Sequence, residues 1–247
     1  MRSATEVINL FNLKYNNLIS GSAPDINFYE MSLYLTEAKK EIIDMYADNN
    51  FKSTFDDTER VRKHISKLIL PKSFSGPELK DYSLDFKNYN TYLVNLDDSI
   101  WRVKYEAATF KKGECSSNHP PAVIPSNYDS VSNQLKNPFR GPSASRIFRL
   151  DSNRNHILIS KYKLEEYRIT YLEMPRPYIL VDLKEFESDF NYGLEQELSI
   201  DGITDKTLNE LDPFIDDLII NRAVEKAVEN YKESSLSNKL SLGSRNL

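Results

Sequence analysis

Few side chains in this sequence have the residue types and the spacing of a catalytic site. Cys115 and His119 lie four residues apart in a segment that also contains Gly113, Pro120 and Pro121. A thiol and an imidazole at hydrogen-bond distance can act as a nucleophile and its base. No acid that would orient the imidazole and no oxyanion-donor loop is recognisable nearby, so an ordinary exposed loop cysteine is the simpler interpretation.

Carboxylates form the second candidate cluster. Glu185, Glu187 and Asp189 lie in an acidic segment with interspersed aromatic residues and could bind a metal ion, and so could Asp97 and Asp98. A solvated or partner-facing surface explains the first group, and a turn between two strands explains the second, which has no third carboxylate at ligand spacing. The metalloprotease, nucleophile-elbow and phosphate-loop patterns are absent. We therefore expect no catalytic residue, no metal site and no cofactor.

Composition excludes several classes of protein. The chain has 247 residues and a net charge of −5, which argues against a protein that grips nucleic acid through a basic surface. A single cysteine excludes an intrachain disulfide framework. No apolar run approaches the roughly 20 residues needed to cross a bilayer. We expect a soluble protein that is made in the cytoplasm and has no membrane partner.

Capping residues and apolar spacing predict helices at both ends of the chain. Ser3 with Glu6 has the spacing of a capping box, and Asn27 with Glu30 repeats it. Apolar residues then recur at steps of three and four, which is typical of amphipathic helices. The predicted helices cover residues 3–19, 27–47, 56–67 and 212–231.

The last helix has the clearest start. Asp212 is a favourable N-cap, and Pro213 suits the first helical position. From residue 232 the sequence is rich in Ser and Asn, which predicts a tail that is disordered alone or ordered only against a partner.

The middle of the chain predicts strands and proline-stiffened connections. Alternating apolar residues predict that Trp101, Val103 and Tyr105 share one face of a strand. Pro175 and Pro177 would form a stiff crossover from the β-rich part back to the helical part. Strands are expected at residues 92–96, 100–110, 146–150, 157–162, 167–171, 178–181 and 198–200, a short helix at 128–135, and loops at 72–90 (with one short strand at 84–86) and 111–125.

A second proline-containing segment, residues 136–142, cannot form regular structure because each proline favours an extended conformation in the residue before it. It contains Asn137, Pro138, Phe139, Arg140 and Pro142. Together with Pro175, Pro177, Asp212 and Pro213, these residues are our candidates for structural or interface roles.

These elements predict an α+β fold with three parts. Residues 1–70 and 199–231 would form a helical bundle from both chain ends. Residues 71–198 would form an inserted antiparallel β-rich domain, and residues 232–247 a flexible C-terminal arm.

Three stretches together resemble a known group of proteins. They are YNNLISGSAPDINFYEMSLYLTEAKKEII; KNPFRGPSASRIFRLD with YRITYLEMPRPYILVDL; and LSIDGIT followed by NELDPF and NRAVEKAVENY. In this order they resemble virion structural proteins of crAss-like phages, which are similar in role to the head-to-tail connector (adaptor or ring) proteins of short-tailed phages. The match departs locally at Asp212 and at Asn221, where a histidine-containing helix start would be expected.

The resemblance implies a non-enzymatic subunit of a ring of about twelve copies below the portal. Its expected partners are other copies of itself, the portal protein, adjacent ring or tail proteins, and genomic DNA that passes through without sequence-specific binding. Its expected location is the neck or tail of the virion. A tail-tube or other tail protein of the same virion is the alternative, and a carboxylate- or cysteine-dependent hydrolase is a further one.

Overall fold

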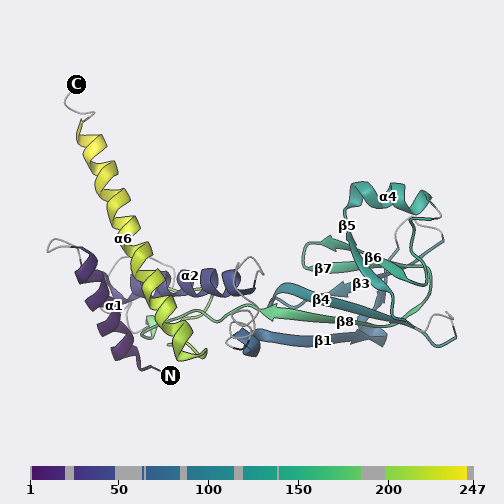
Figure 1. The fold of residues 1–247 in the computed structure, drawn as a ribbon, viewed down its shortest axis with the longest axis horizontal. Helices are drawn as coiled ribbons and strands as arrows, with labels where there is room; N and C mark the ends of the chain where they lie inside the picture. Colours follow the sequence, from purple (N-terminus) through teal and green to yellow (C-terminus); the bar gives the residue numbers. More distant parts are fainter. Residues whose placement is uncertain are drawn as a thin grey trace. The chain divides into compact units, whose positions relative to one another are not determined.

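The chain divides into two compact units, one formed by Met1–Lys67 with Pro175–Leu247 and the other by Leu68–Met174. The computed structural model describes residues 2–19, 25–47, 63, 65–83, 88–113, 119–137, 139–184 and 198–243, and the side chains of the last helix as far as Lys232. Helices dominate the first unit and strands the second, so the fold class is α+β (Figure 1).

The first unit, here called the helical unit, contains three long helices. The predicted caps are confirmed: the Ser3 hydroxyl accepts from the Glu6 amide at 3.3 Å, and the Asn27 side chain accepts from the Glu30 amide at 2.8 Å. The predicted helix at 56–67 lies largely outside the described residues. The helices are α1 (Ala4–Leu18), α2 (Phe28–Ala47) and α6 (Pro213–Gly243), and η1 (Ser66–Leu68) is a short 3-10 turn at the boundary of the two units.

Helix α6 packs against both α1 and α2 (Figure 1). Its apolar side chains recur at helical spacing and are almost completely buried, which is the main source of stability for such a bundle. Ion pairs at the edge of the bundle, such as Arg222 with Glu41 at 2.9 Å, are partly exposed and contribute about 0–1 kcal/mol each. The buried stripe of α6 consists of Ile215, Ile219, Ile220, Ala223, Val224, Ala227 and Val228.

The C-terminal part of α6 differs from the sequence-based expectation. A tail without regular structure was predicted from residue 232, but the helix continues to Gly243. Extending a helix that already exists adds one hydrogen bond per residue without a new nucleation step. The Ser and Asn residues of this segment weaken a helix by only a few tenths of a kcal/mol each. A composition rich in these residues therefore does not by itself end the helix.

The segment that follows Pro175 does not form the strand predicted at 178–181. Its backbone donors are satisfied by α2 instead: the Tyr178 amide donates to Thr36 Oγ1 at 2.9 Å, and the Leu180 amide donates to Ser32 Oγ at 3.1 Å. Only one isolated bridge, Ile179 with Thr207, resembles strand pairing. This segment therefore belongs to the helical unit, whereas the sequence-based division had assigned residues 175–198 to the β-rich domain.

The second unit, here called the β unit, contains two sheets. A three-stranded antiparallel sheet has the order β1-β8-β4, and a five-stranded sheet has the order β2-β3-β7-β6-β5, in which only β5 and β6 are parallel. The strands are β1 (Ile69–Ser75), β2 (Lys80–Asp81), β3 (Asn90–Asn95), β4 (Ile100–Phe110), β5 (Ala122–Ser126), β6 (Arg146–Ser152), β7 (Asn155–Ser160) and β8 (Leu164–Glu173), with helix α4 (Tyr128–Lys136) and the 3-10 turn η2 (Gly76–Glu78).

Three of these strands, β1, β2 and β5, lie wholly or partly in segments that were predicted to be loops. β1 contains Pro71 and β5 contains Pro125, and both strands are at the edge of their sheet. Proline lacks an amide donor but is tolerated in an edge strand, where one side of the backbone needs no partner. In these two segments, the proline is therefore a sign of an edge strand and does not indicate a loop.

Two apolar layers stabilise the β unit. Between the sheets, Phe74, Tyr167 and Leu158 belong to one buried cluster that draws on both sheets. On the other face of the five-stranded sheet, Val131 of α4 packs with Phe148. The five-stranded sheet is thus covered on both faces.

One prediction about β4 is wrong. Tyr105 was expected to share a face with Val103, but Val103 packs against the core between the sheets while Tyr105 is 64% exposed. The pairing of β4 with β8 shifts register between these two residues. A bulge adds one residue to the strand and reverses the faces that follow.

Candidate functional site

The residues with catalytic or ligand chemistry are not brought together in the described structure. Cys115, Glu185, Glu187 and Asp189 lie outside the described residues. Asp97 pairs with Lys72 and Asp98 pairs with Arg154, both at the surface. Among the described residues, no group of three His, Cys, Asp or Glu side chains could hold a metal ion, and no helix is long and apolar enough to cross a membrane.

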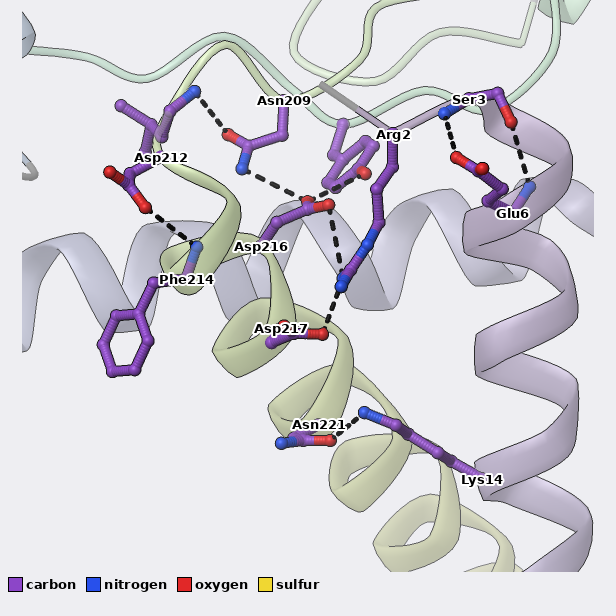
Figure 2. Close-up of polar contacts among 12 residues, drawn as sticks. Arg2, Ser3, Glu6, Lys14, Asn209, Asp212, Phe214, Asp216, Asp217 and Asn221 are labelled. Carbon is purple, nitrogen blue, oxygen red and sulfur yellow. Dashed lines mark hydrogen bonds and ion pairs between the residues drawn. The ribbon is translucent and has the colours of Figure 1, made fainter.

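The start of α6 carries a buried polar network (Figure 2). The Asp212 carboxylate accepts from the Phe214 amide at 2.9 Å, which confirms the predicted N-cap. One turn later, Asp216 Oδ1 accepts from Asn209 Nδ2 at 3.2 Å and from the Tyr178 hydroxyl at 3.0 Å. A carboxylate at a helix N-terminus is further favoured by the helix dipole. The network therefore fixes the entry into α6 against the segment that follows the crossover.

The N-terminus of the chain closes this network. Figure 2 shows Arg2 with its guanidinium group between Asp216 and Asp217, at 3.7 Å and 2.6 Å. The hydrogen bond from Arg2 lowers the pKa of the Asp217 carboxyl. Burial, followed by the charge of Asp216, raises the pKa of the Tyr178 hydroxyl well above its usual value. Residues from three distant parts of the chain thus meet at one helix end.

The proline crossover is held by a buried lysine. Lys39 of α2 donates to the backbone carbonyl of Arg176 at 2.9 Å, and burial lowers the pKa of its ammonium group to about 8. Pro175 and Pro177 are buried, whereas Arg176 between them is exposed. Both prolines are therefore covered, and Arg176 between them is accessible to a partner.

The other proline-containing segment has the opposite character. Phe139 is 86% exposed, the highest value among the large apolar side chains of the described chain. Its turn is rigid nevertheless: Asn137 Oδ1 accepts from the Phe139 amide at 3.0 Å, and Arg146 donates to the carbonyls of Gly141 and Phe139. Pro142 is buried beneath the turn, and Pro138 lies outside the described residues. We call residues 137–142 the Phe139 turn.

Gly141 in this turn packs closely against Tyr89. A Cβ atom on Gly141 would lie 2.8 Å from the hydroxyl oxygen of Tyr89, closer than real Cβ contacts allow. The turn therefore rests directly on the residue that precedes β3, which helps to fix the direction of Phe139.

Comparison with known proteins gives this arrangement a context. A family model described as phage tail ring protein 3/4 matches residues 3–239. The chain belongs to the phage tail ring protein 3/4 family. The sequence is 32% identical to Ring protein 3 of Bacteroides phage crAss001 over 216 residues, which cover 84% of this chain and 88% of that protein. It is 26% identical to Ring protein 4/5 of the same phage in an alignment that covers 98% of this chain and 99% of that protein.

The resemblance to ring proteins of crAss-like phages is thus confirmed, and it covers both units. This ring protein matches its relatives over most of their length, including the start of α6, the crossover and the Phe139 turn.

Sequence reasoning missed a polar cluster between the two sheets of this ring protein. Glu106 of β4 accepts from the Tyr167 hydroxyl at 2.9 Å and pairs with Arg149 of β6. His156 Nδ1 lies 2.8 Å from the same hydroxyl. Because the hydroxyl gives its only proton to Glu106, the imidazole is the donor in that contact. No signal in the sequence placed Glu106 inward, since the register shifts of β4 decide its face.

The buried imidazole predicts a pH dependence. Burial, followed by the charge of Arg149, lowers the pKa of His156 to about 4, whereas the unfolded chain has the ordinary value of about 6.5. The contribution of the neutral imidazole to the free energy of unfolding of the β unit should be fully present above pH 6.5. It should decrease as the pH falls towards 4, by about 3 kcal/mol at most. Urea unfolding of wild type and His156→Gln across this range measures it. If the free energy of unfolding falls equally with decreasing pH in both proteins, the assignment to His156 is contradicted.

Proposed function

We propose that this protein is the subunit of a closed ring in the head-to-tail connector, below the portal, where it joins portal to tail and encloses the DNA channel. The family match over residues 3–239, with two relatives named ring proteins, carries the proposal. A ring built from one kind of chain closes when each subunit uses two different surfaces, and about twelve copies would surround the channel.

The net charge of the chain supports a channel through which DNA passes without being held. The net charge of the chain is −5, and proteins that hold DNA do so mainly through basic contacts to phosphates. An acidic subunit would let the genome slide past without sequence-specific binding. Its partners would be other copies of the same chain, the portal protein and the adjacent ring or tail proteins. It would be made in the host cytoplasm and act in the neck or tail of the virion, without enzymatic activity.

Reconstitution with the portal tests the proposal. The purified protein should be mixed with its portal and studied by size-exclusion chromatography with light scattering and by negative-stain microscopy. We expect a complex with a mass that corresponds to a ring of subunits on the portal. The same measurement without the portal does not test the proposal, because ring subunits can stay monomeric until they bind the portal. A protein that binds no virion component would contradict the proposal.

A position farther down the tail is the second candidate, because the family description names a tail ring. In that case the protein would form part of the tail tube or a lower ring. Labelling of the subunit in intact particles separates the two positions, since the label would lie either next to the portal or towards the tail tip.

The C-terminal part of α6 is the proposed arm towards a neighbour. The last buried side chain of the described helix is Val228, and Lys232 is exposed. Deletion of residues 232–247 should therefore shift the melting temperature by only a few degrees and impair ring or portal assembly.

Deletion of residues 219–247 is the matched control. It removes the buried residues Ile219, Ile220 and Val224 and should unfold the helical unit. If the shorter deletion also unfolds the protein, or if it assembles at full yield, residues 232–247 are not an assembly arm.

A further inference from the structure

Several connections between strands of the β unit lie at the same end of the unit. The strand register places Ile69 beside Leu172 near the two junctions with the rest of the chain, and Ser75 beside Glu166 at the opposite end. At this opposite end β3 begins beside the end of β7, and β6 begins next to them. The connections before β3, after β4, before β6 and between β7 and β8 therefore meet there. We call it the loop end.

The loop end contains a cavity of about 710 Å³. Most of the residues that line it are polar or charged, and they include Lys111 and Lys163. The apolar part of the wall includes Tyr92 and Leu164, which are buried. Asp81 and Glu165 line the same cavity and are exposed. Within the described part of the chain, these two carboxylates make no ion pair. The cavity lies on the side of the loop end formed by β2, β3 and β8.

The Phe139 turn lies at the same end but on another side, in the connection that enters β6. Its hydrogen bonds to Asn137 and Arg146 hold the backbone of the turn. The Phe139 ring is 86% exposed and does not line the cavity of its own chain. Arg140 beside it is exposed as well. An aromatic side chain on a rigid turn loses little entropy on binding, which is typical of residues that dominate an interface.

These two surfaces suit each other. A Phe ring can contact the apolar part of the wall, which includes Leu79 and Tyr92, and the Lys111 ammonium in the wall can contact its face. An adjacent Arg can pair with Asp81 or Glu165, which make no ion pair within the described residues and share the wall with two lysines. The surfaces differ in shape and charge and lie on different strands of one unit, with β7 between β3 and β6. Two different, complementary surfaces on one chain are what a ring of identical subunits requires.

We propose that Phe139 of one subunit inserts into the loop-end cavity of the next subunit, where Arg140 pairs with Asp81 or Glu165. The partner is thus a second copy of this chain, and the inference rests on the proposed ring. Each subunit gives its Phe139 turn to one neighbour and receives that of the other. The contact is directional, so it continues around the ring until the ring closes.

Disulfide trapping tests this contact. In a Cys115→Ser background, Phe139→Cys and Ser83→Cys place one thiol on the turn and one at the cavity wall. Assembled particles that carry both substitutions are oxidised and separated on a non-reducing gel. We expect a ladder of covalent multimers. Tyr105→Cys with Ser83→Cys is the matched control, because Tyr105 is another exposed aromatic residue of the β unit, and it should give no ladder.

Phe139→Ala provides a second readout. Because the side chain is exposed, its removal should leave the melting temperature unchanged, yet lower the yield of rings on portal about tenfold or more. Tyr105→Ala should assemble at the wild-type yield. Rings of the Phe139→Cys, Ser83→Cys variant that give no ladder, together with normal assembly of Phe139→Ala, would overturn this contact and leave the proposed ring intact. If wild-type particles contain no ring of this chain, the proposed function fails and the contact fails with it.

Discussion

Replacement of Arg149 with methionine is expected to lower the free energy of unfolding of the β unit by about 3–5 kcal/mol, because it leaves a buried carboxylate without its partner. Arg149 pairs with Glu106 between the two sheets, and both side chains are only 12% exposed. Methionine keeps much of the apolar stem but carries no charge. Within the described part of the chain, Glu106 would retain only the Tyr167 hydroxyl as a donor. Urea unfolding followed by tyrosine and tryptophan fluorescence measures the loss.

The double substitution Arg149→Met with Glu106→Met is the matched control. Removal of both charges leaves no unpaired ion, and buried ion pairs replaced by apolar residues are often close to neutral in stability. We expect the double variant to recover most of the lost stability. A double variant as unstable as Arg149→Met alone would mean that lost packing, and not the unpaired charge, explains the effect.

Replacement of Asp216 with alanine is expected to destabilise the helical unit by about 2–5 kcal/mol, because two buried donors lose their acceptor. The Tyr178 hydroxyl and the Asn209 amide both donate to Asp216 Oδ1, and the residue is itself buried. The substitution also removes a negative charge from the first turn of α6. Urea unfolding followed by far-UV circular dichroism, which reports mainly on the helical unit, measures the change.

Asp217 offers a matched control on the same helix turn. It pairs with Arg2 as Asp216 does, but its side chain is 48% exposed. Asp217→Ala should therefore cost less than about 1 kcal/mol. Equal losses for the two variants would show that the pairing with Arg2, rather than the buried contacts of Asp216, stabilises this region.

Local signals in the sequence predicted the helices well. The caps at Ser3, Asn27 and Asp212 need only residues within one turn, and all three form as expected. The bounds of β4 were also predicted, because an 11-residue run of strand-forming residues stands between clear turns. In these cases the interactions that decide the structure lie within the element itself.

Local sequence patterns could not predict which distant segments pair with each other. β1 forms because β8 pairs with it from far along the chain, and β5 forms on β6 through the crossover helix α4. The apolar run that starts at Tyr178 would suit a buried strand equally well, but Thr36 and Ser32 of α2 accept its amides. Which partner satisfies a backbone donor depends on the tertiary fold.

The candidate interface residues show the same limit. The prolines predicted that residues 136–142 form no regular structure, yet they could not tell that Phe139 would be exposed while Pro142 is buried. Pro175 and Pro177 were singled out with them, and both are buried. Exposure depends on what covers a residue in space, and a single sequence gives no measure of that.

A three-dimensional reconstruction of the assembled virion tests ring membership most directly. We expect density for this chain to repeat around the particle axis between portal and tail, in a closed ring with the DNA channel at its centre. The absence of this chain from the particle, or its presence as isolated copies outside any ring, would contradict the proposed function.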